Sequence, residues 1–235
     1  MRKINIIEKL SDIGFEIDDL VLGDFDVIGE WCAKKQRARD SELYKKAGAF
    51  FRPNYERGLL IYALILEYDI KTFLEIGFGR GYGTLCAAMA MQENGGGTIT
   101  TIDPNFDQTH IEKLKHTFPK EWFDMIEFVP AFSQDYLFDH DDKFDFIYVD
   151  GDHRYEAVQR DWQLCEKRYN KLILFDDYIP AEASNSQEDI ECSKVIDEIE
   201  DESKELIIMD RRIFLDDRKI PDDEINYGQV LLTNE

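Results

Sequence analysis

Short apolar runs separated by longer amphipathic segments dominate the chain from residue 71 onward. Each run is nearly continuous in hydrophobic residues, which is typical of strands covered on both faces of a sheet. We predict five such strands, at 71–77, 97–103, 125–131, 144–150 and 171–177. The segments between them have helix-forming composition and the length of a crossover helix, notably 82–94, 108–118 and 155–169. This alternation predicts an α/β fold built on a parallel sheet.

The end of the chain departs from this alternation. An acidic segment at 186–199 predicts a helix, and Ser186 with Asp189 fits a capping box at its start. Two strand candidates follow, at 204–215 and 227–234, with only a short polar segment between them. Because no crossover helix fits there, these strands are expected to pair antiparallel as a hairpin. The prediction is a Rossmann-like, seven-stranded mixed sheet with helices on both faces.

The start of the chain predicts a different unit. Residues 1–50 mix charged and apolar residues in helical-looking patterns, and 52–70 predicts a helix that leads into the first strand. We therefore expect a helical extension at 1–54 and the main domain at 55–235. The extension is expected to cap an active site or to form a contact between two copies in a homo-oligomer.

Composition and charge narrow the range of functions. Hydrophobic residues make up 43% of the 235 residues, as in globular proteins, and the formal net charge of -22 disfavours binding to nucleic acid. The four cysteines form no C-x-x-C pair, which favours reduced thiols in the cytoplasm. The longest apolar stretch, 58–66, is too short to cross a membrane, and the first residues lack a signal sequence.

A glycine-rich turn, "FLEIGFGRGYG" at 73–83, follows the first predicted strand. Such a turn allows a ligand to approach the main chain at the carboxyl end of the sheet. The dinucleotide fingerprint G-x-G-x-x-G is broken here by Tyr82 and Thr84. Glu75 would repel a pyrophosphate and suits a cationic or hydrogen-donating ligand instead.

The stretch "LEIGFGRGYG" resembles the E/D-x-G-x-G-x-G motif of class I S-adenosylmethionine-dependent methyltransferases. The resemblance implies that the glycines lie against the methionine part of the cofactor and that Asp103, ending the second strand, binds its ribose. We expect the strand order 3-2-1-4-5-7-6. The predicted cofactor contacts are Glu75, Gly77, Phe78, Gly79, Gly81, Tyr82, Asp103, Pro104, Phe132, Ser133 and Asp150.

Three of these residues also have simpler explanations. Asp103 alone is equally suited to capping the turn that follows its strand. Phe132 and Ser133, after the third strand, are expected to line an adenine pocket, where the ring packs on the purine and the hydroxyl bonds its edge. A core phenylalanine and a helix N-cap serine are equally compatible with the sequence.

Acidic residues also gather where the fourth and fifth strands end. Asp150, Asp152 and His153 follow one strand, and Asp176 and Asp177 end the next. Converging carboxylates repel unless a cation compensates them, and oxygen ligands favour a hard ion such as Mg²⁺ over zinc.

This arrangement is similar to the metal-dependent O-methyltransferases of the catechol and caffeoyl-coenzyme A type, and still more to the bacterial macrolide-sugar group. The resemblance implies a metal held by Asp150, Asp176 and Asp177. His153 stands where catechol-type enzymes have a lysine base, and a histidine is suited to accept a proton near neutral pH. Without a metal, the acids would cap turns or helices and His153 would bond the backbone. His110, His116 and His140 are interpreted as surface residues.

The sequence therefore predicts an S-adenosylmethionine-dependent O-methyltransferase that acts on a small hydroxylated acceptor, such as a sugar or a natural-product glycoside. Two alternatives stay open: an inactive cofactor-binding protein of the same fold, and an aminopropyltransferase, for which the acidic charge would suit a polyamine. Tyr82 and Thr84 disfavour a nicotinamide-dependent dehydrogenase.

Overall fold

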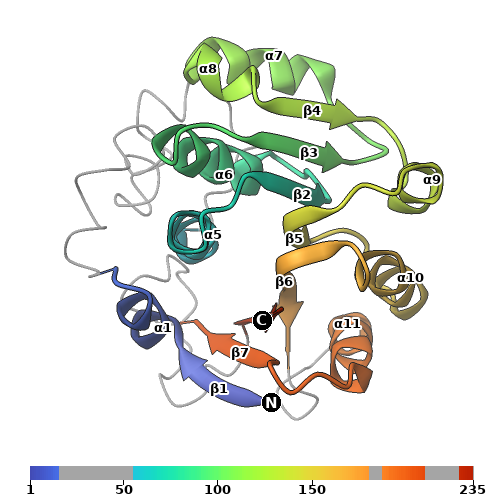
Figure 1. Ribbon diagram of the computed structural model, residues 1–235. Coiled ribbons are helices and arrows are strands. Elements are labelled where there is room, and N and C mark those ends of the chain that lie inside the picture. Colours follow the sequence, from blue (N-terminus) through green and yellow to red (C-terminus); the bar gives the residue numbers. More distant parts are fainter. Residues whose placement is uncertain (16–54, 180–186, 210–227, 235) are drawn as a thin grey trace.

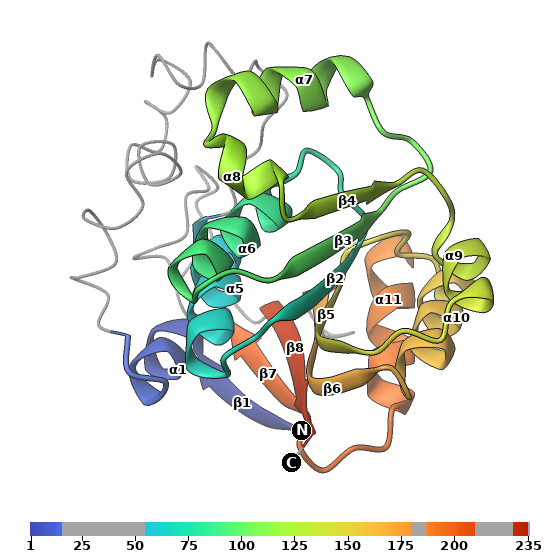
Figure 2. The same ribbon diagram turned by 45° about the horizontal axis from the view of Figure 1, so that its top comes forward.

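The computed structural model of the chain describes residues 1–15, 55–179, 187–209 and 228–234. Within these ranges the strands form one eight-stranded sheet in the order β1-β7-β8-β6-β5-β2-β3-β4, which Figure 2 shows most clearly. The strands are β1 (Arg2–Asn5), β2 (Thr72–Ile76), β3 (Thr98–Ile102), β4 (Ile126–Val129), β5 (Phe144–Val149), β6 (Tyr169–Tyr178), β7 (Glu205–Ile208) and β8 (Gly228–Thr233).

The predicted sheet is confirmed, with one strand more than expected. β2 to β6 run parallel to one another, and β8 pairs antiparallel with both β6 and β7. Counted from β2, the order is 3-2-1-4-5-7-6, as the sequence predicted. Most residues of β2, β3, β5 and β6 are buried, which explains why these strands read as continuous apolar runs, whereas the edge strand β4 has no fully buried residue.

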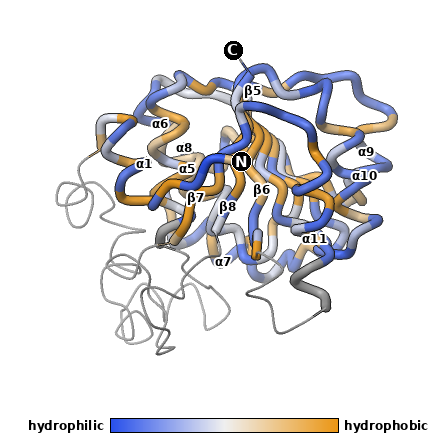
Figure 3. The backbone as a smooth tube through the Cα atoms, turned by 90° about the horizontal axis from the view of Figure 1, so that it is seen from below, coloured by the Kyte–Doolittle hydropathy of each residue, from blue (hydrophilic) through white to orange (hydrophobic). Residues whose placement is uncertain are grey.

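Helices cover both faces of the sheet (Figure 1). One face packs against α1 (Ile6–Asp12), α5 (Tyr55–Glu67), α6 (Tyr82–Glu93), α7 (Gln108–Thr117) and α8 (Lys120–Phe123). The other packs against α9 (Ser133–Asp139), α10 (Tyr155–Cys165) and α11 (Gln187–Glu198). Figure 3 shows hydrophobic residues concentrated in the strands between the two helical layers. The two apolar layers form the core.

The first strand corrects the expectation of a purely helical start. Residues 2–5 pair parallel with β7 at the edge of the sheet, and only Ile4 of the four is buried. Two ion pairs hold β1 and the helix that follows it against β7. Glu205 of β7 pairs with Arg2 of β1 at 3.3 Å and with Lys9 of α1 at 2.6 Å. Four residues are too few for alternation to distinguish a strand from a helical turn, so the sequence pattern missed it.

Several predictions fall outside the described residues. They include most of the proposed N-terminal extension (16–54), the capping box that begins at Ser186, the continuation of the sixth predicted strand (204–215) beyond residue 209, and Cys32. The cysteines in the described ranges, Cys86, Cys165 and Cys192, are buried free thiols. In the same ranges, no helix combines the length and the apolar character needed to cross a membrane.

The strand order indicates at which edge of the sheet a ligand would bind. From β2 the chain first adds β3 and β4 on one side, and then returns to add β5 and β6 on the other. The sheet therefore has a switch point between β3 and β5, at β2. In open α/β sheets ligands bind outside the carboxyl ends of the strands at such a point. The glycine-rich turn and the acidic residues predicted from the sequence all lie at this end.

Candidate active site

A cavity of about 550 Å³ opens at the carboxyl ends of β2, β3 and β5. Its walls come from the glycine-rich turn, from the loops after β3, β4 and β5, and from one side of α10. Among the residues that line it are Gly77, Gly79, Asp103, Phe132, Asp150 and Asp161. A pocket of this size and position suits a nucleoside-sized ligand.

The glycine-rich turn owes its shape to backbone angles that favour glycine. Gly77, Gly79 and Gly81 have φ values of +96°, +52° and +82°. A Cβ on Gly77 would lie 2.1 Å from the carbonyl oxygen of Asp150, so the turn after β2 lies directly against the turn after β5. A Cβ on Gly79 would meet no atom within 4 Å, because this residue faces the cavity.

Asp103 ends β3 and also lines the cavity. One carboxylate oxygen accepts a hydrogen bond from the backbone N–H of Gly79 at 3.2 Å, and the other accepts one from Asn105 at 2.7 Å. The turn bond that the sequence allowed is therefore present. Each oxygen has two lone pairs, so both can still accept a bond from a ligand hydroxyl.

Glu75 lies below the turn and does not line the cavity. The side chain is buried between β2 and α6, where it accepts hydrogen bonds from the hydroxyls of Thr84 and Thr101. Burial raises the pKa of Glu75 to about 7, although the two threonine hydroxyls act in the opposite direction. A Cβ on Gly83 would lie 2.5 Å from the carboxylate, so the fourth glycine of the motif makes room for this acid.

The other predicted cofactor contacts divide into two groups. Pro104, Phe132 and Ser133 line the cavity, and the Phe132 ring is 59% exposed there rather than in the core. Phe78 and Tyr82 are buried beneath the turn, where the Phe78 ring contacts Phe106 and Phe128. The sequence could not separate these groups because both follow strand ends, and a sequence pattern does not show which side chains turn into the cavity.

Asp161 on α10 was not predicted, yet it forms part of the cavity wall. Its carboxylate accepts a hydrogen bond from the Ser133 hydroxyl, and burial raises its pKa to about 6. The sequence did contain one indication of this role: Asp161 lies on the same face of α10 as the buried residues Val158 and Cys165.

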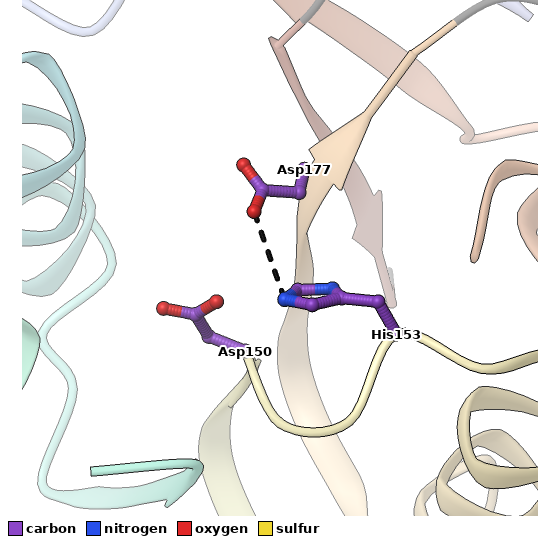
Figure 4. Close-up of side chains that lie close together, drawn as sticks. All are labelled: Asp150, His153 and Asp177. Carbon is purple, nitrogen blue, oxygen red and sulfur yellow. Dashed lines mark ion pairs between the residues drawn. The ribbon is translucent and has the colours of Figure 1, made fainter. Parts of the chain in front are cut away.

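Three side chains predicted for metal binding or catalysis meet beside the cavity (Figure 4). Asp150 follows β5, His153 lies in the loop before α10, and Asp177 is the second-last residue of β6. Each offers one ligand atom, and these atoms all lie within 4.8 Å of one another. His153 Nε2 is 3.7 Å from a carboxylate oxygen of Asp177. Asp150 also lines the cavity, so the two sites share a residue.

Asp176 is buried beside Asp150 and against the helical layer that contains α5. Its buried carboxylate lies 2.8 Å from Arg57 Nε of that helix, in an ion pair that is poorly aligned as a hydrogen bond. Consequently neither carboxylate oxygen has a hydrogen-bond partner among the described residues. The same guanidinium bonds Asp177 through Nη2. Arg57 was not predicted; the signal for it was an arginine at the start of a helix that is otherwise almost entirely apolar.

The charges of this cluster do not balance within the described residues. Asp150, Asp176 and Asp177 bring three carboxylates together, and Arg57 provides one guanidinium. Burial and the charge of Asp176 raise the pKa of Asp150 well above its ordinary value. The excess negative charge must therefore take up protons or a cation. The unpartnered oxygens of Asp176 and the carboxylate–imidazole group of its neighbours both fit a divalent cation.

His110 corrects a further expectation. It is 3% exposed, and its Nε2 lies 3.0 Å from the carbonyl oxygen of Arg80 in the glycine-rich turn. The ring thus supports the turn from α7. His116 and His140 are exposed, as predicted. The polar sequence around His110 gave no sign that this face of α7 would be covered.

Comparison with known proteins agrees with this geometry. Residues 74–178 match a family model described as a methyltransferase domain. The chain is similar to an O-methyltransferase from Bacillus cereus in complex with SAH (16% identity, TM-score 0.58), with 88% of this chain and 100% of that chain covered. It is also similar to the O-methyltransferase TomG from Streptomyces achromogenes, involved in tomaymycin synthesis, in complex with SAM (13% identity, TM-score 0.60, 93% and 94% covered). No curated protein sequence matches the chain significantly.

These findings indicate which fold the chain has. Residues 74–178 match a methyltransferase domain, and the described chain has the fold of the two O-methyltransferases that were solved with SAH and SAM. The resemblance inferred from the glycine motif is thereby confirmed. The matched segment begins at β2 and ends at β6, so it contains the cavity and the acidic cluster but neither α5 nor the terminal hairpin.

Replacing two glycines of the turn should have very different effects. Gly77→Ala is expected to lower the free energy of unfolding by about 3 kcal/mol or more, because a positive φ of +96° and a backbone clash act together. Gly79→Ala adds a methyl group without a clash at a φ of +52°, where a side chain is better tolerated, and should cost only about 1 kcal/mol. Urea unfolding of the two variants measures the difference. Equal losses would show that the turn does not lie against Asp150 as described.

The buried Glu75 predicts a specific dependence of stability on pH. Below pH 4.5 the carboxyl is protonated in the folded and unfolded chains alike. Between 4.5 and about 7 only the unfolded chain has lost the proton, so rising pH lowers the free energy of unfolding. The full cost, roughly 3 kcal/mol, is reached above the folded-state pKa. The stability of Glu75→Gln relative to the wild type should rise by this amount across that window, as measured by urea unfolding. A constant difference would contradict a raised pKa.

Proposed function

We propose that the protein transfers the methyl group of S-adenosylmethionine to a hydroxyl of a small molecule, such as a sugar or a natural-product glycoside, with the help of a divalent cation. One observation carries this proposal: Asp150 belongs both to the wall of the cavity and to the cluster with His153 and Asp177. A cofactor in the cavity and a cation in the cluster would therefore be neighbours.

The residues of the cavity supply binding and orientation. The cofactor itself brings a methyl group that is activated by its positive sulfonium, so the protein mainly has to align the acceptor oxygen with that group. Gly77 and Gly79 leave the main chain open to the ligand, and the Asp103 carboxylate can accept bonds from both ribose hydroxyls. Phe132 offers a ring face to the purine, and Ser133 with Asp161 offers polar atoms to its edge.

The residues of the acidic cluster would hold the cation and remove the proton. A bound divalent cation polarises a hydroxyl and lowers its pKa. Asp150 and Asp177 are the proposed ligands, and His153, half-buried beside them, is the proposed base. Asp176, the third ligand in the sequence prediction, is engaged by Arg57 in this structure. Both Mg²⁺ and Mn²⁺ suit the carboxylates, and Mn²⁺ also tolerates an imidazole ligand.

The surroundings of the cluster bear on the acceptor. At the cavity wall Arg154 and Arg160 offset Asp152 and Glu156, but the acidic cluster and the chain as a whole carry excess negative charge. A neutral or cationic acceptor fits this field better than an anionic one. The buried free thiols of the described residues suit the predicted cytoplasmic location. A homo-oligomer and the absence of a nucleic-acid partner remain predictions.

The cofactor site is tested by calorimetric titration with S-adenosylhomocysteine. The wild type is expected to bind in the micromolar range. Asp103→Asn should weaken binding by about tenfold to a hundredfold, because bonds to a charged acceptor become neutral ones. Asp107→Asn is the matched control, since Asp107 only caps α7 and asparagine caps equally well. A wild type that fails to bind would overturn the proposed function.

The cation and the base are tested together in a methyl-transfer assay with hydroxylated acceptors. Chelation should abolish turnover, and Mg²⁺ or Mn²⁺ should restore it. His153→Ala should lower kcat by about a hundredfold or more while S-adenosylhomocysteine and Mn²⁺ still bind, whereas His140→Ala should have no effect. If His153→Ala instead loses Mn²⁺ binding, His153 is a ligand rather than the base. Absence of transfer to any acceptor would favour the inactive cofactor-binding alternative.

A further inference from the structure

Arg57 reaches the acidic cluster from outside the methyltransferase-domain match. It lies in the first turn of α5, and its side chain is only 21% exposed. The guanidinium lies 2.8 Å from Asp176 through Nε and bonds Asp177 through Nη2. One guanidinium therefore holds two consecutive acids of β6, although its helix lies more than 100 residues earlier in the chain.

The backbone explains why both acids are within its reach. The pairing of β6 with β8 shifts register between Phe175 and Tyr178, so two residues of β6 oppose one residue of β8. Asp177 within this bulge has a φ of +53°, a left-handed conformation that is unfavourable for a residue with a side chain. Regular alternation would send the two side chains to opposite faces. The bulge instead leaves both within reach of the same guanidinium.

The two carboxylate oxygens of Asp177 have different surroundings. Oδ1 accepts the bond from Arg57, and Oδ2 is the atom 3.7 Å from His153 Nε2. A carboxylate that is tied at one oxygen cannot rotate freely, so the other oxygen keeps facing Asp150 and His153. Partners of this kind, one step behind the ligands of a metal site, are known to affect the affinity for the ion.

Asp176 completes the arrangement. A guanidinium beside a cation site would repel the ion, but Asp176 is buried against Arg57 and compensates its charge. The consecutive acids then have separate tasks. Asp176 anchors Arg57, and Asp177 faces the cluster.

We propose that Arg57 is a positioning residue that orients the Asp177 carboxylate and thereby sets the affinity of the cluster for a divalent cation. This inference rests on the proposed function, because it assumes that the cluster of Asp150, His153 and Asp177 takes up such an ion.

The test compares pairs of variants with equal charge, because removing a positive charge alone would strengthen cation binding. Arg57→Lys keeps the charge but has one nitrogen in place of the planar fork that contacts Asp176 and Asp177 through separate nitrogens, and it should bind Mn²⁺ about tenfold more weakly than the wild type. Arg57→Gln and Arg57→Met are both neutral, and only glutamine can donate a bond to Asp177. The glutamine variant should bind Mn²⁺ about tenfold more tightly than the methionine variant. Electron paramagnetic resonance of free Mn²⁺ measures all four proteins without an acceptor.

A matched control is Arg168→Lys. Arg168 is similarly buried, at 18% exposure, and its guanidinium donates hydrogen bonds to one backbone carbonyl of α9 and one of α10. The substitution should leave Mn²⁺ affinity unchanged, whatever its effect on stability. Titration with S-adenosylhomocysteine checks that every variant retains a folded cofactor site, and the neutral pair decides the matter if Arg57→Lys does not fold.

The outcomes separate the inference from the proposed function. If the wild type binds Mn²⁺ and each pair shows equal affinities, Arg57 does not position Asp177 and the inference is wrong, while the proposed function stands. If the wild type binds S-adenosylhomocysteine but no Mn²⁺, the inference and the metal-assisted step are both wrong. If the differences within both pairs appear, the inference is supported.

Discussion

The close contact between the turn after β2 and the turn after β5 is the constraint on which the rest of the site depends. Gly77 lies so near the carbonyl of Asp150 that no side chain fits between them. The backbone N–H of Asp150 also donates to the carbonyl of Ile76 at 2.8 Å, which extends the pairing of β2 with β5 to the edge of the cavity. Through this contact one residue, Asp150, joins the cofactor cavity to the acidic cluster.

Buried acids are the second feature of this site, and each is accommodated differently. Glu75 accepts hydrogen bonds from two threonine hydroxyls, Asp161 accepts one from a serine hydroxyl, and Asp176 lies against the guanidinium of Arg57. Burial without a full set of donors favours the protonated form, which explains the raised pKa values. These groups reduce the stability of the fold, and their concentration at the carboxyl edge of the sheet is typical of a functional site.

Elements outside the matched segment also help to build the acidic cluster. α5 precedes the domain match and contributes Arg57 to the acidic cluster. β8 follows it and forms the bulge with β6 from which Asp176 and Asp177 project. A segment limited to residues 74–178 would contain the acids without the helix and the strand that orient them.

The sequence by itself determined the sheet and the location of the site. The continuous apolar strands, the glycine-rich turn and the strand-terminal acids are local patterns, and they were sufficient to predict five parallel strands, a terminal antiparallel pair and the edge at which Asp103, Asp150 and Asp177 lie. These features depend on neighbouring residues and on general rules of α/β topology, so they can be inferred without coordinates. The strand order from β2 to β8 came from the resemblance that the glycine motif carries.

Only the tertiary structure decided the direction of the side chains. Glu75 and Asp176 were predicted as ligand contacts, yet both face the helical layer that contains α5 and α6. Alternation cannot predict this at Asp176 and Asp177, because a bulge interrupts it there. Arg57, Asp161 and His110 acquire their partners only when remote helices pack on the sheet. Such contacts join residues that are far apart in the chain, so no local sequence pattern predicts which residues will meet.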